Sequence, residues 1–451
     1  MNLAHEHRLA PGAIRVRFAL GVLLCSLALF TLSANAQTPN PQQPLSDSMA
    51  IAEAHPTAPP TALRDLVDQA EKNNPELAAS FHAWKARTYA PKQASALPET
   101  ELTVQQFAVG SPRPFAGFSN SDFAYIGFGA SQELPYPGKR SLRSQVAERE
   151  ADTLHEQTDS VRRQVIENLK QVYFHLAYIQ QTLGILQRND QLLNQVQEVA
   201  ENRYRVGQGN QQDVLKAQLQ HTKILQEIAH HHQEEGQLEA QLKQILNRPQ
   251  ESADVVTENL VATPLNHSAA DLLQKTRENN PDVRAHTAMV RGQETQVELA
   301  HKEFRPDFSV GYMYEHTGSQ ARDYYMATFS VRLPNRGRKS AALAEALENQ
   351  ERSKQELQSE VLRTLSEVQQ QYVLVKQSEE RLKIYEQGLV PQSNATFQAG
   401  LAGYQSNRQD FESLISSFLD VLNLDLEYRS ELAEHESAIA KLERLTGVTL
   451  P

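Results

Sequence analysis

The sequence contains a single cysteine, Cys25, among its 451 residues. Neither a disulfide framework nor a cysteine-based metal site can therefore be built within this chain. Cys25 lies in an apolar run near the N-terminus, and Leu24 stands where a lipoprotein signal carries a small residue. Lipidation of Cys25 is thus the less favoured alternative to simple removal of this segment.

The first residues are typical of an export signal. Arginines precede an apolar run over residues 18–30, and the small side chains of residues 34–36 offer a cleavage position. The apolar run is shorter than the roughly 20 residues that span a bilayer. We expect residues 1–36 to be a cleaved signal peptide and the proline-rich residues 37–61 to be a linker without a core.

Long apolar runs and enzyme motifs are missing from the rest of the chain. No apolar run after residue 36 is long enough for a transmembrane helix. The net charge of −11 disfavours binding to phosphate backbones, so nucleic acid is not an expected partner. Neither a Gly-x-Ser-x-Gly nor a His-Glu-x-x-His motif occurs, and no compact domain offers paired carboxylates. We therefore predict no enzyme, no catalytic residue and no cofactor.

What the chain does contain is one plan written twice, about 200 residues apart. Its landmarks are an Asn-Asn-Pro segment, a Leu-Pro corner followed by glycine and basic residues, and a tyrosine before a turn. The Asn-Asn-Pro segments lie at 63–75 and 270–281, the Leu-Pro corners at 134–140 and 333–339, and the tyrosine turns at 204–207 and 404–407. Three matches in one order indicate a duplication with repeats at 62–250 and 251–451.

Each repeat should fold as helices, two strands, a very long helix, a tip turn and a further helix. The strands show period-two alternation, and the first long helix contains no proline and only Gly184 as glycine. The expected strands lie at about 99–110, 123–133, 306–315 and 324–333. In the first repeat, the long helix is expected at 139–204, the tip at 205–212 and the following helix at 211–247. In the second repeat, the same three elements are expected at 338–404, 405–410 and 410–446. Helices at 75–97 and 281–304 would stack end to end on the shorter helices that follow the tips. The length of the long helices indicates coiled-coil packing.

In this order, spacing and duplication, residues 62–451 resemble the TolC family of outer membrane efflux proteins. The motifs that carry the resemblance are residues 73–77, 134–140 and 204–215 with their echoes in the second repeat. The resemblance implies a mainly α fold with a β-barrel contribution, in which three chains give four strands each to one twelve-stranded barrel. Four strands cannot close a barrel alone, whereas the strands of three chains can. The long hairpins would form a helical tunnel.

The resemblance also implies a function, a location and partners. The chain would be a homotrimeric channel in the outer membrane lipid that extends into the periplasm and docks on a periplasmic adaptor and an inner-membrane pump. It would conduct metal ions or small toxic molecules passively and have no active site. Residues 206–215 are more similar to the heavy-metal branch of the family than to the drug branch. A soluble periplasmic coiled-coil scaffold and an exported hydrolase are the alternatives.

Family members carry tyrosine, glycine and acidic residues around the periplasmic tips, where the tunnel closes. Asn407 replaces the glycine in the second repeat, and Gln409 stands where an arginine is common. The residues implied for the tip and gate are Tyr204, Gly207, Asp213, Tyr404, Asp410 and Glu412. Tyr404 with Asp213 as its hydrogen-bond partner is the favoured gate pair. Alternatively, the tyrosines only pack at helix ends and Asp213 only caps a helix.

Two further sets of residues are candidates. Pro135, Gly138, Pro334 and Gly337 are expected to end the strands and turn the chain into the long helices, although plain strand-end loops would look the same. His231 and Glu235, one helical turn apart, are weak metal candidates within a histidine-rich segment. Such a segment is more often a solvated polar face, so no metal site is predicted.

Overall fold

The computed structural model describes residues 60–107, 113, 124–317 and 322–450. These residues belong to one compact unit, Thr57–Pro451. The predicted signal peptide at 1–36, including Cys25, and the predicted linker up to residue 59 lie outside the described residues. Parts of the predicted first-repeat strands, at 108–110 and 123, also lie outside them.

The two halves of the unit have the same order of elements. The first half contains α1 (Leu63–Asn73), α2 (Pro75–Arg87), α3 (Ala90–Ser95), β1 (Glu101–Phe107), β2 (Tyr125–Leu134), α4 (Lys139–Arg205) and α5 (Gln211–Ile245). The second contains α6 (Ala269–Asn279), α7 (Pro281–Lys302), β3 (Asp307–Thr317), β4 (Tyr324–Arg332), α8 (Arg336–Ile384), the π-helix η1 (Tyr385–Leu389), α9 (Val390–Gln405) and α10 (Phe411–Thr446). The expected duplicated, mainly helical fold with four strands is thus confirmed.

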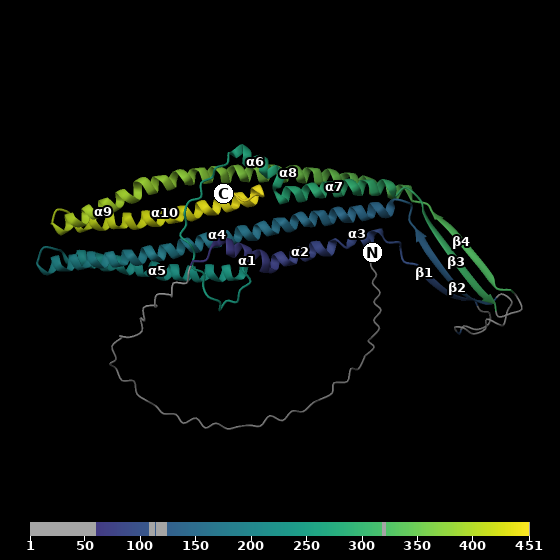
Figure 1. Ribbon diagram of the computed structural model, residues 1–451, viewed down its shortest axis with the longest axis horizontal. Coiled ribbons are helices and arrows are strands. Elements are labelled where there is room, and N and C mark those ends of the chain that lie inside the picture. Colours follow the sequence, from purple (N-terminus) through teal and green to yellow (C-terminus); the bar gives the residue numbers. More distant parts are fainter. Residues whose placement is uncertain (1–59, 108–112, 114–123, 318–321, 451) are drawn as a thin grey trace, which may run out of the picture. The chain divides into compact units, whose positions relative to one another are not determined.

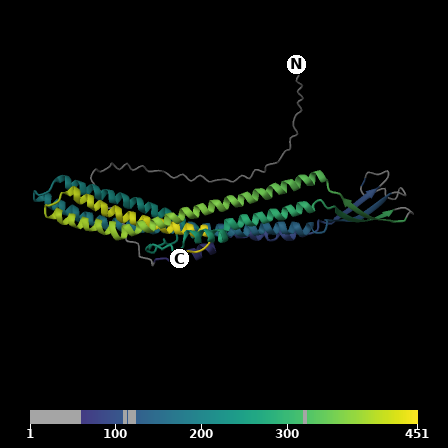
Figure 2. The same cartoon turned by 90° about the horizontal axis from the view of Figure 1, so that it is seen from above.

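The helix α4 runs for 67 residues without interruption. Its neighbours α5, α7 and α10 lie alongside it (Figures 1 and 2). Leu169, Leu176, Ile179 and Leu193 of α4 are completely buried against these helices and their neighbours. Burial of one such side chain contributes about 1.5–3 kcal/mol. Packing along this face therefore stabilises the hairpins. Among the described residues, no helix combines the length and the apolar character needed to cross a membrane.

The second asparagine of each Asn-Asn-Pro segment joins two helices end to end. The Asn74 Oδ1 accepts the amide hydrogens of Glu76 and Leu77, which caps α2, while its Nδ2 donates to the Ile245 carbonyl at the end of α5, 2.9 Å away. Asn280 likewise caps α7 and donates to the Leu445 carbonyl of α10 at 2.9 Å. One side chain thus satisfies orphan groups of two helix ends. The expected end-to-end stacking follows from these joints.

Two expected helices are interrupted near prolines. The helix expected at 75–97 is divided into α2 and α3 because Pro91, at the start of α3, cannot donate a helical hydrogen bond. The helix expected at 338–404 changes to a π-helix at 385–389, directly before Pro391 in the first turn of α9. A proline clashes with the carbonyl four residues earlier, and the wider π turn accommodates that carbonyl.

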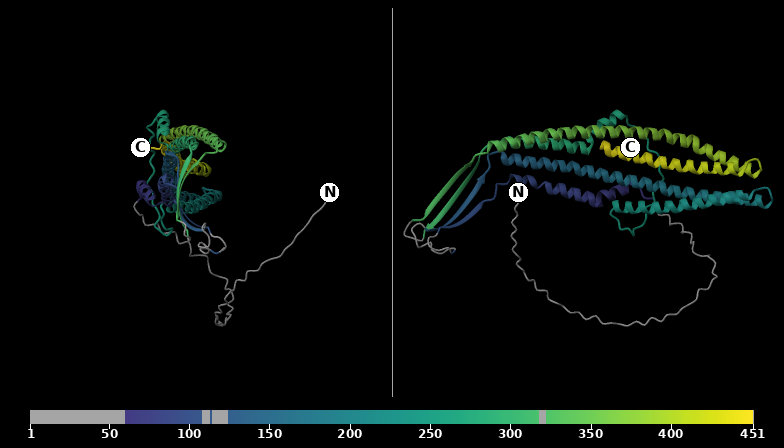
Figure 3. Two further views of the ribbon diagram at one scale, coloured as in Figure 1. Left: turned by 90° about the vertical axis from the view of Figure 1, so that its right-hand side faces the viewer. Right: turned by 180° about the vertical axis from the view of Figure 1, so that it is seen from behind.

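The four strands form one antiparallel sheet in the order β1-β2-β3-β4, beyond one end of the long helices (Figures 1 and 3). The pairing register places apolar residues of all four strands on one face. That face carries Leu102, Val104, Ile126, Phe128, Leu134, Phe308, Val310, Tyr312, Tyr314, Tyr325, Phe329 and Val331. The other face carries mainly glycine, serine, threonine and charged residues. The alternation predicted for the second-repeat strands is confirmed, and it extends across the whole sheet.

Candidate functional site at the helical tips

Both hairpins end in the same turn. Gly207 has φ +72° and Asn407 has φ +60°, so both adopt the left-handed conformation that glycine and asparagine tolerate best. In each turn the residue that follows donates its amide hydrogen to a carbonyl five residues earlier, at 2.8 Å. The sequence relation between Gly207 and Asn407 therefore has a geometric basis, because the replacement preserves the helix C-terminal cap.

The caps of the next helices decide between the two roles considered for Asp213. Asn210 caps α5 by accepting the amide hydrogen of Gln212, so Asp213 is not the capping residue. Asp410 does cap α10, accepting the Ser413 amide hydrogen at 2.7 Å, and this bond lowers the pKa of the Asp410 carboxyl. Asp410 is therefore occupied in holding its own helix.

Tyr404 is 2% exposed and packs edge-on against Phe411. Its hydroxyl donates to Asp213 Oδ2 across 3.3 Å, which connects α9 of the second hairpin to α5 of the first. Burial and, after it, the negative charge of Asp213 raise the pKa of the Tyr404 hydroxyl to about 12. The hydroxyl thus remains a hydrogen-bond donor at neutral pH. The structure brings together the expected gate pair.

Arg203, which the sequence did not single out, contacts both tips. Its guanidinium lies 4.2 Å from the ring centroid of Tyr404. It donates to the Tyr404 carbonyl, to the Asn407 side chain and, at 3.1 Å, to the Gln208 carbonyl. Arg203 therefore fixes the turn of its own hairpin and binds the turn of the other.

The remaining predicted tip residues differ from this pair. Glu412 forms an ion pair with Lys216 across the two hairpins, but its side chain is 72% exposed. Exposed pairs of this kind contribute about 0–1 kcal/mol. Tyr204 is 48% exposed, in contrast to the buried Tyr404. The two tips thus have equivalent backbones but different side-chain surroundings. Of the two tip tyrosines, only Tyr404 is buried.

The two strand-to-helix corners, expected to be alike, are built differently. Gly138 has φ +93° and ends the turn before α4. Gly337 is not left-handed; it lies in the first turn of α8, which Asn335 caps by accepting the Arg338 amide hydrogen. Gly337 therefore does not supply the turn from strand to helix that was expected of it, because the helix already begins at residue 336. Pro135 and Pro334 follow the ends of β2 and β4 as expected.

Buried charges hold the first corner. Lys139, 1% exposed, donates to both Asp307 oxygens at 2.9 and 3.0 Å and to the Arg305 carbonyl at 2.8 Å. Nearby, Glu303 accepts from Arg143 at 2.9 Å and from Lys339 at 2.8 Å. Burial opposes ionisation of Glu303, but these bonds outweigh it and lower the pKa to about 2. The corner joins the starts of both long helices to the sheet.

The structure does not bring His231 and Glu235 together. His231 lies 3.3 Å from Glu234, and His232 lies 3.2 Å from Glu235. His175 of α4 also approaches Glu234, at 3.2 Å. Within the described part of the chain, no group of three or more histidine, cysteine, aspartate or glutamate side chains is arranged to hold a metal ion. In the structure, His231 and Glu235, the two weak candidates, therefore each contact a different side chain.

The comparisons agree with the fold and with the duplicated motifs. A family model described as "Outer membrane efflux protein" matches residues 66–248 and 272–407. The chain belongs to the outer membrane efflux protein family. No curated protein sequence matches it.

Solved structures share the same fold. The outer membrane protein VceC of Vibrio cholerae matches with a TM-score of 0.72 and 16% identity, over 86% of this chain and 96% of that one. CusC matches with a TM-score of 0.73 and 15% identity, over 86% of this chain and 92% of that one. The MtrE outer membrane channel of Neisseria gonorrhoeae, in its open state, matches with a TM-score of 0.71 and 16% identity, over 86% of this chain and 89% of that one.

Proposed function

We propose that the chain is the outer membrane channel of a tripartite efflux pump. Three copies would form a conduit that passes metal ions or small toxic molecules from an inner-membrane pump and a periplasmic adaptor to the outside. The channel would catalyse no reaction, bind no cofactor and extend from the outer membrane into the periplasm. Membership of the outer membrane efflux protein family supports this role.

The observation that carries the proposal is the two-faced sheet. Its apolar face runs across all four strands, and large side chains on it are strongly exposed, including Leu102 at 78% and Phe329 at 66%. Among the described residues, β1 and β4 are each paired on one side only. Unpaired edges are not tolerated in lipid, whereas joining β4 of one copy to β1 of the next would remove them. Three copies would close a twelve-stranded barrel with an apolar exterior.

The tip contacts support a second part of the proposal, a gate. In this proposal Tyr404, Asp213 and Arg203 hold the two hairpins of each copy together and keep the tunnel closed. The Gly207 turn would then be the surface that the adaptor approaches. The lean towards metal ions rests on the sequence of residues 206–215 alone.

Conductance and cross-linking test the channel. Purified protein lacking residues 1–36 contains no cysteine, so introduced cysteines are unique. Val104→Cys with Phe329→Cys places one thiol on each edge strand, and a flexible bismaleimide should trap dimers and trimers. Phe128→Cys with Tyr314→Cys is the matched control, because these residues are directly paired within one chain. A protein that stays monomeric and never conducts in planar bilayers would refute the channel.

A further inference from the structure

A pocket of about 530 Å³ lies where the two repeats meet. Its walls come from α4, from α10 and from residues 256–259 of the segment that joins the repeats. Gly184, the only glycine of α4, lines this pocket, and a β-carbon there would meet only Arg188 Nη1, at 3.7 Å. The helix thus leaves room for a ligand at this position.

Three of the side chains that line the pocket carry polar groups without partners. Both the Nε2 and the Oε1 of Gln181 are buried without a hydrogen bond, and so is the Nε of Arg429. Among the described residues, the Arg188 guanidinium has neither a hydrogen bond nor an ion pair. Buried polar atoms are almost always hydrogen-bonded in native proteins, because an unpaired one costs about 1–3 kcal/mol. Unpaired groups from both repeats therefore line the same pocket.

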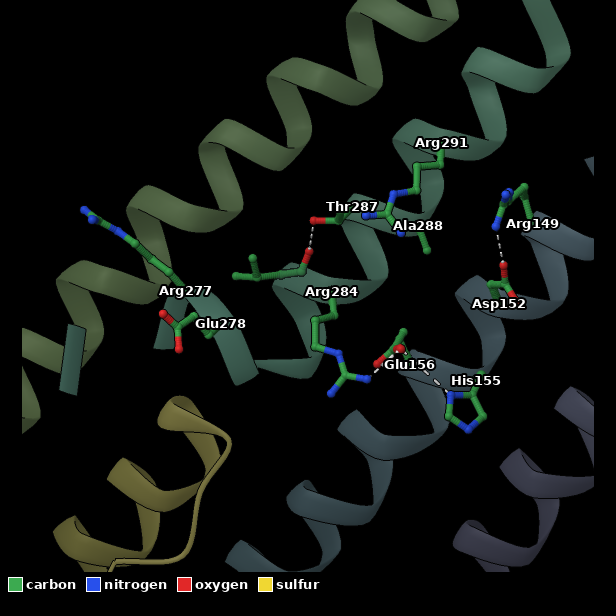
Figure 4. A pocket seen from close by; sticks show the side chains of 11 residues that line it. Arg149, Asp152, His155, Glu156, Arg277, Glu278, Arg284, Thr287, Ala288 and Arg291 are labelled. Atoms are coloured by element: carbon green, nitrogen blue, oxygen red, sulfur yellow. Dashed lines mark hydrogen bonds and ion pairs between the residues drawn. The ribbon is translucent and has the colours of Figure 1, made fainter. Parts of the chain in front are cut away.

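In a second polar pocket, by contrast, two arginines have carboxylate partners. It lies between α4 and the α6–α7 joint, has a volume of about 480 Å³, and is also rich in arginine (Figure 4). There Arg149 pairs with Asp152 at 3.1 Å and Arg284 with Glu156 at 2.8 Å, as the dashed lines in Figure 4 show. Two of its arginines are thus neutralised by the protein itself. The arginines of the pocket beside Gly184 have no such carboxylate partner among the described residues.

The wall formed by the joining segment is fixed in place. The Gln180 Nε2 donates to the Val255 carbonyl at 2.9 Å, and its Oε1 accepts from the amide and the hydroxyl of Thr257 at 3.0 and 2.8 Å. The Tyr173 hydroxyl accepts the Glu258 amide hydrogen at 2.9 Å. A ligand would therefore meet a preformed wall, which lowers the entropy cost of binding.

We propose that this pocket binds a small oxyanion that also carries hydroxyl groups. Arg188 and Arg429 would hold its carboxylate or phosphate group, since guanidinium groups match the planar geometry of such anions. The Gln181 amide supplies a donor and an acceptor for the remaining polar groups, and the Glu258 carboxylate on the wall accepts from a hydroxyl. The ligand would join α4 of the first repeat to α10 of the second. This site does not depend on the proposed channel function.

Isothermal titration of the detergent-solubilised protein with citrate and with inorganic phosphate, at constant ionic strength, tests the site. Binding of citrate alone identifies a carboxylate ligand, and binding of phosphate alone identifies a phosphate ligand. Arg188→Gln should weaken binding on the order of 10- to 100-fold, the loss of one charged hydrogen bond. Arg277→Gln, which removes an arginine of the pocket in Figure 4, is the matched control and should leave the affinity unchanged.

Gly184→Leu separates binding from folding. Leucine is a better helix former than glycine, so the thermal midpoint should not fall, while the side chain fills the pocket and abolishes binding. Citrate and phosphate also stabilise proteins by exclusion from their surfaces, which would act equally on all variants. The proposal is overturned if neither anion binds the unaltered protein, or if both variants bind with its affinity.

Discussion

The guanidinium of Arg203 covers the ring of Tyr404 at 4.2 Å and also donates to its backbone carbonyl, although the two residues belong to different hairpins. A cation over an aromatic face contributes about 0.5–2 kcal/mol, depending on how well water is excluded. The same tyrosine reaches Asp213 through its hydroxyl. Tyr404 thus links α4 and α5 of the first hairpin to α9 of the second.

We expect the Tyr404–Asp213 hydrogen bond to favour the closed tip. Hydrogen bonds to charged groups contribute about 1.5–3 kcal/mol, and a trimer would contain one bond per chain. A change of about 5.5 kcal/mol takes a two-state equilibrium from 1:99 to 99:1. Tyr404→Phe and Asp213→Ala should therefore each raise the resting single-channel conductance, and the double variant should not exceed the larger single effect. Unchanged conductance at equal trimer yield would leave these residues a packing role only.

The contacts of Arg203 predict a larger effect than loss of the Tyr404 hydroxyl. Arg203→Gln removes the cation from the Tyr404 ring together with the charged hydrogen bonds to both turns. Arg203→Lys keeps the charge but cannot reach several acceptors at once, so an intermediate conductance is expected. Arg205→Gln is the control, because Arg205 lies in the same last turn and forms no hydrogen bond or ion pair with the second hairpin among the described residues. Equal conductance in the Arg203→Gln and Arg205→Gln channels would contradict the role given to Arg203.

The tip also shows what the sequence can and cannot predict. Hydrophobic periodicity, Asn-Asn-Pro and the alternating strands predicted the elements and their order, because local geometry determines those patterns. Arg203 was not recognised because a basic residue in the last turn of a helix is common for electrostatic reasons alone. Two of its three acceptors, Tyr404 and Asn407, lie about 200 residues away in the sequence. Such contacts depend on tertiary packing.

The strand-to-helix corners and the π-helix also depend on surroundings that the sequence motifs do not show. Gly138 and Gly337 occupy equivalent motif positions, yet only Gly138 is left-handed, because Asn335 starts the second helix earlier. Pro391 is visible in the sequence, but a proline can end, kink or widen a helix. Which of these occurs depends on the neighbours that hold α9 in line with α8.

Gly207 offers a test of the docking surface. A β-carbon at this position would meet nothing within 4 Å, so a large side chain has space in the isolated chain and only its backbone angle is strained. Gly207→Trp should therefore abolish efflux in cells while trimer assembly stays normal. Gly207→Asn is the control for turn geometry and should be close to neutral, since Asn407 adopts the same left-handed conformation, with φ +60°, in the equivalent turn. Efflux that survives Gly207→Trp at normal protein levels would exclude this turn as the docking surface.

The asparagine joints predict a stability difference between two substitutions at one position. Asn280→Asp keeps an Oδ acceptor for the start of α7 but replaces the donor to the Leu445 carbonyl with a repelling oxygen. Asn280→Ala loses both roles. We expect alanine to cost on the order of 2–3 kcal/mol, a cap plus a buried unsatisfied carbonyl, in denaturant unfolding. Asn394→Ala, on an exposed part of α9, is the control, and an equally small effect at both positions would show that the joint contributes little.

Glu303 predicts how stability depends on pH at the first corner. Its pKa of about 2 in the folded protein lies below the ordinary value of 4.5, because hydrogen bonds from Lys339 and Arg143 outweigh the effect of burial. The unfolded chain therefore binds a proton at a higher pH than the folded chain does, and stability falls as the pH drops from about 4.5 towards 2. Glu303→Gln should flatten this part of the curve in denaturant unfolding monitored by circular dichroism. Glu294→Gln, an exposed change on α7, should leave it unaltered. If the slope between these pH values is the same in the unaltered protein and in Glu303→Gln, the ion pairs at the corner do not account for the acid sensitivity.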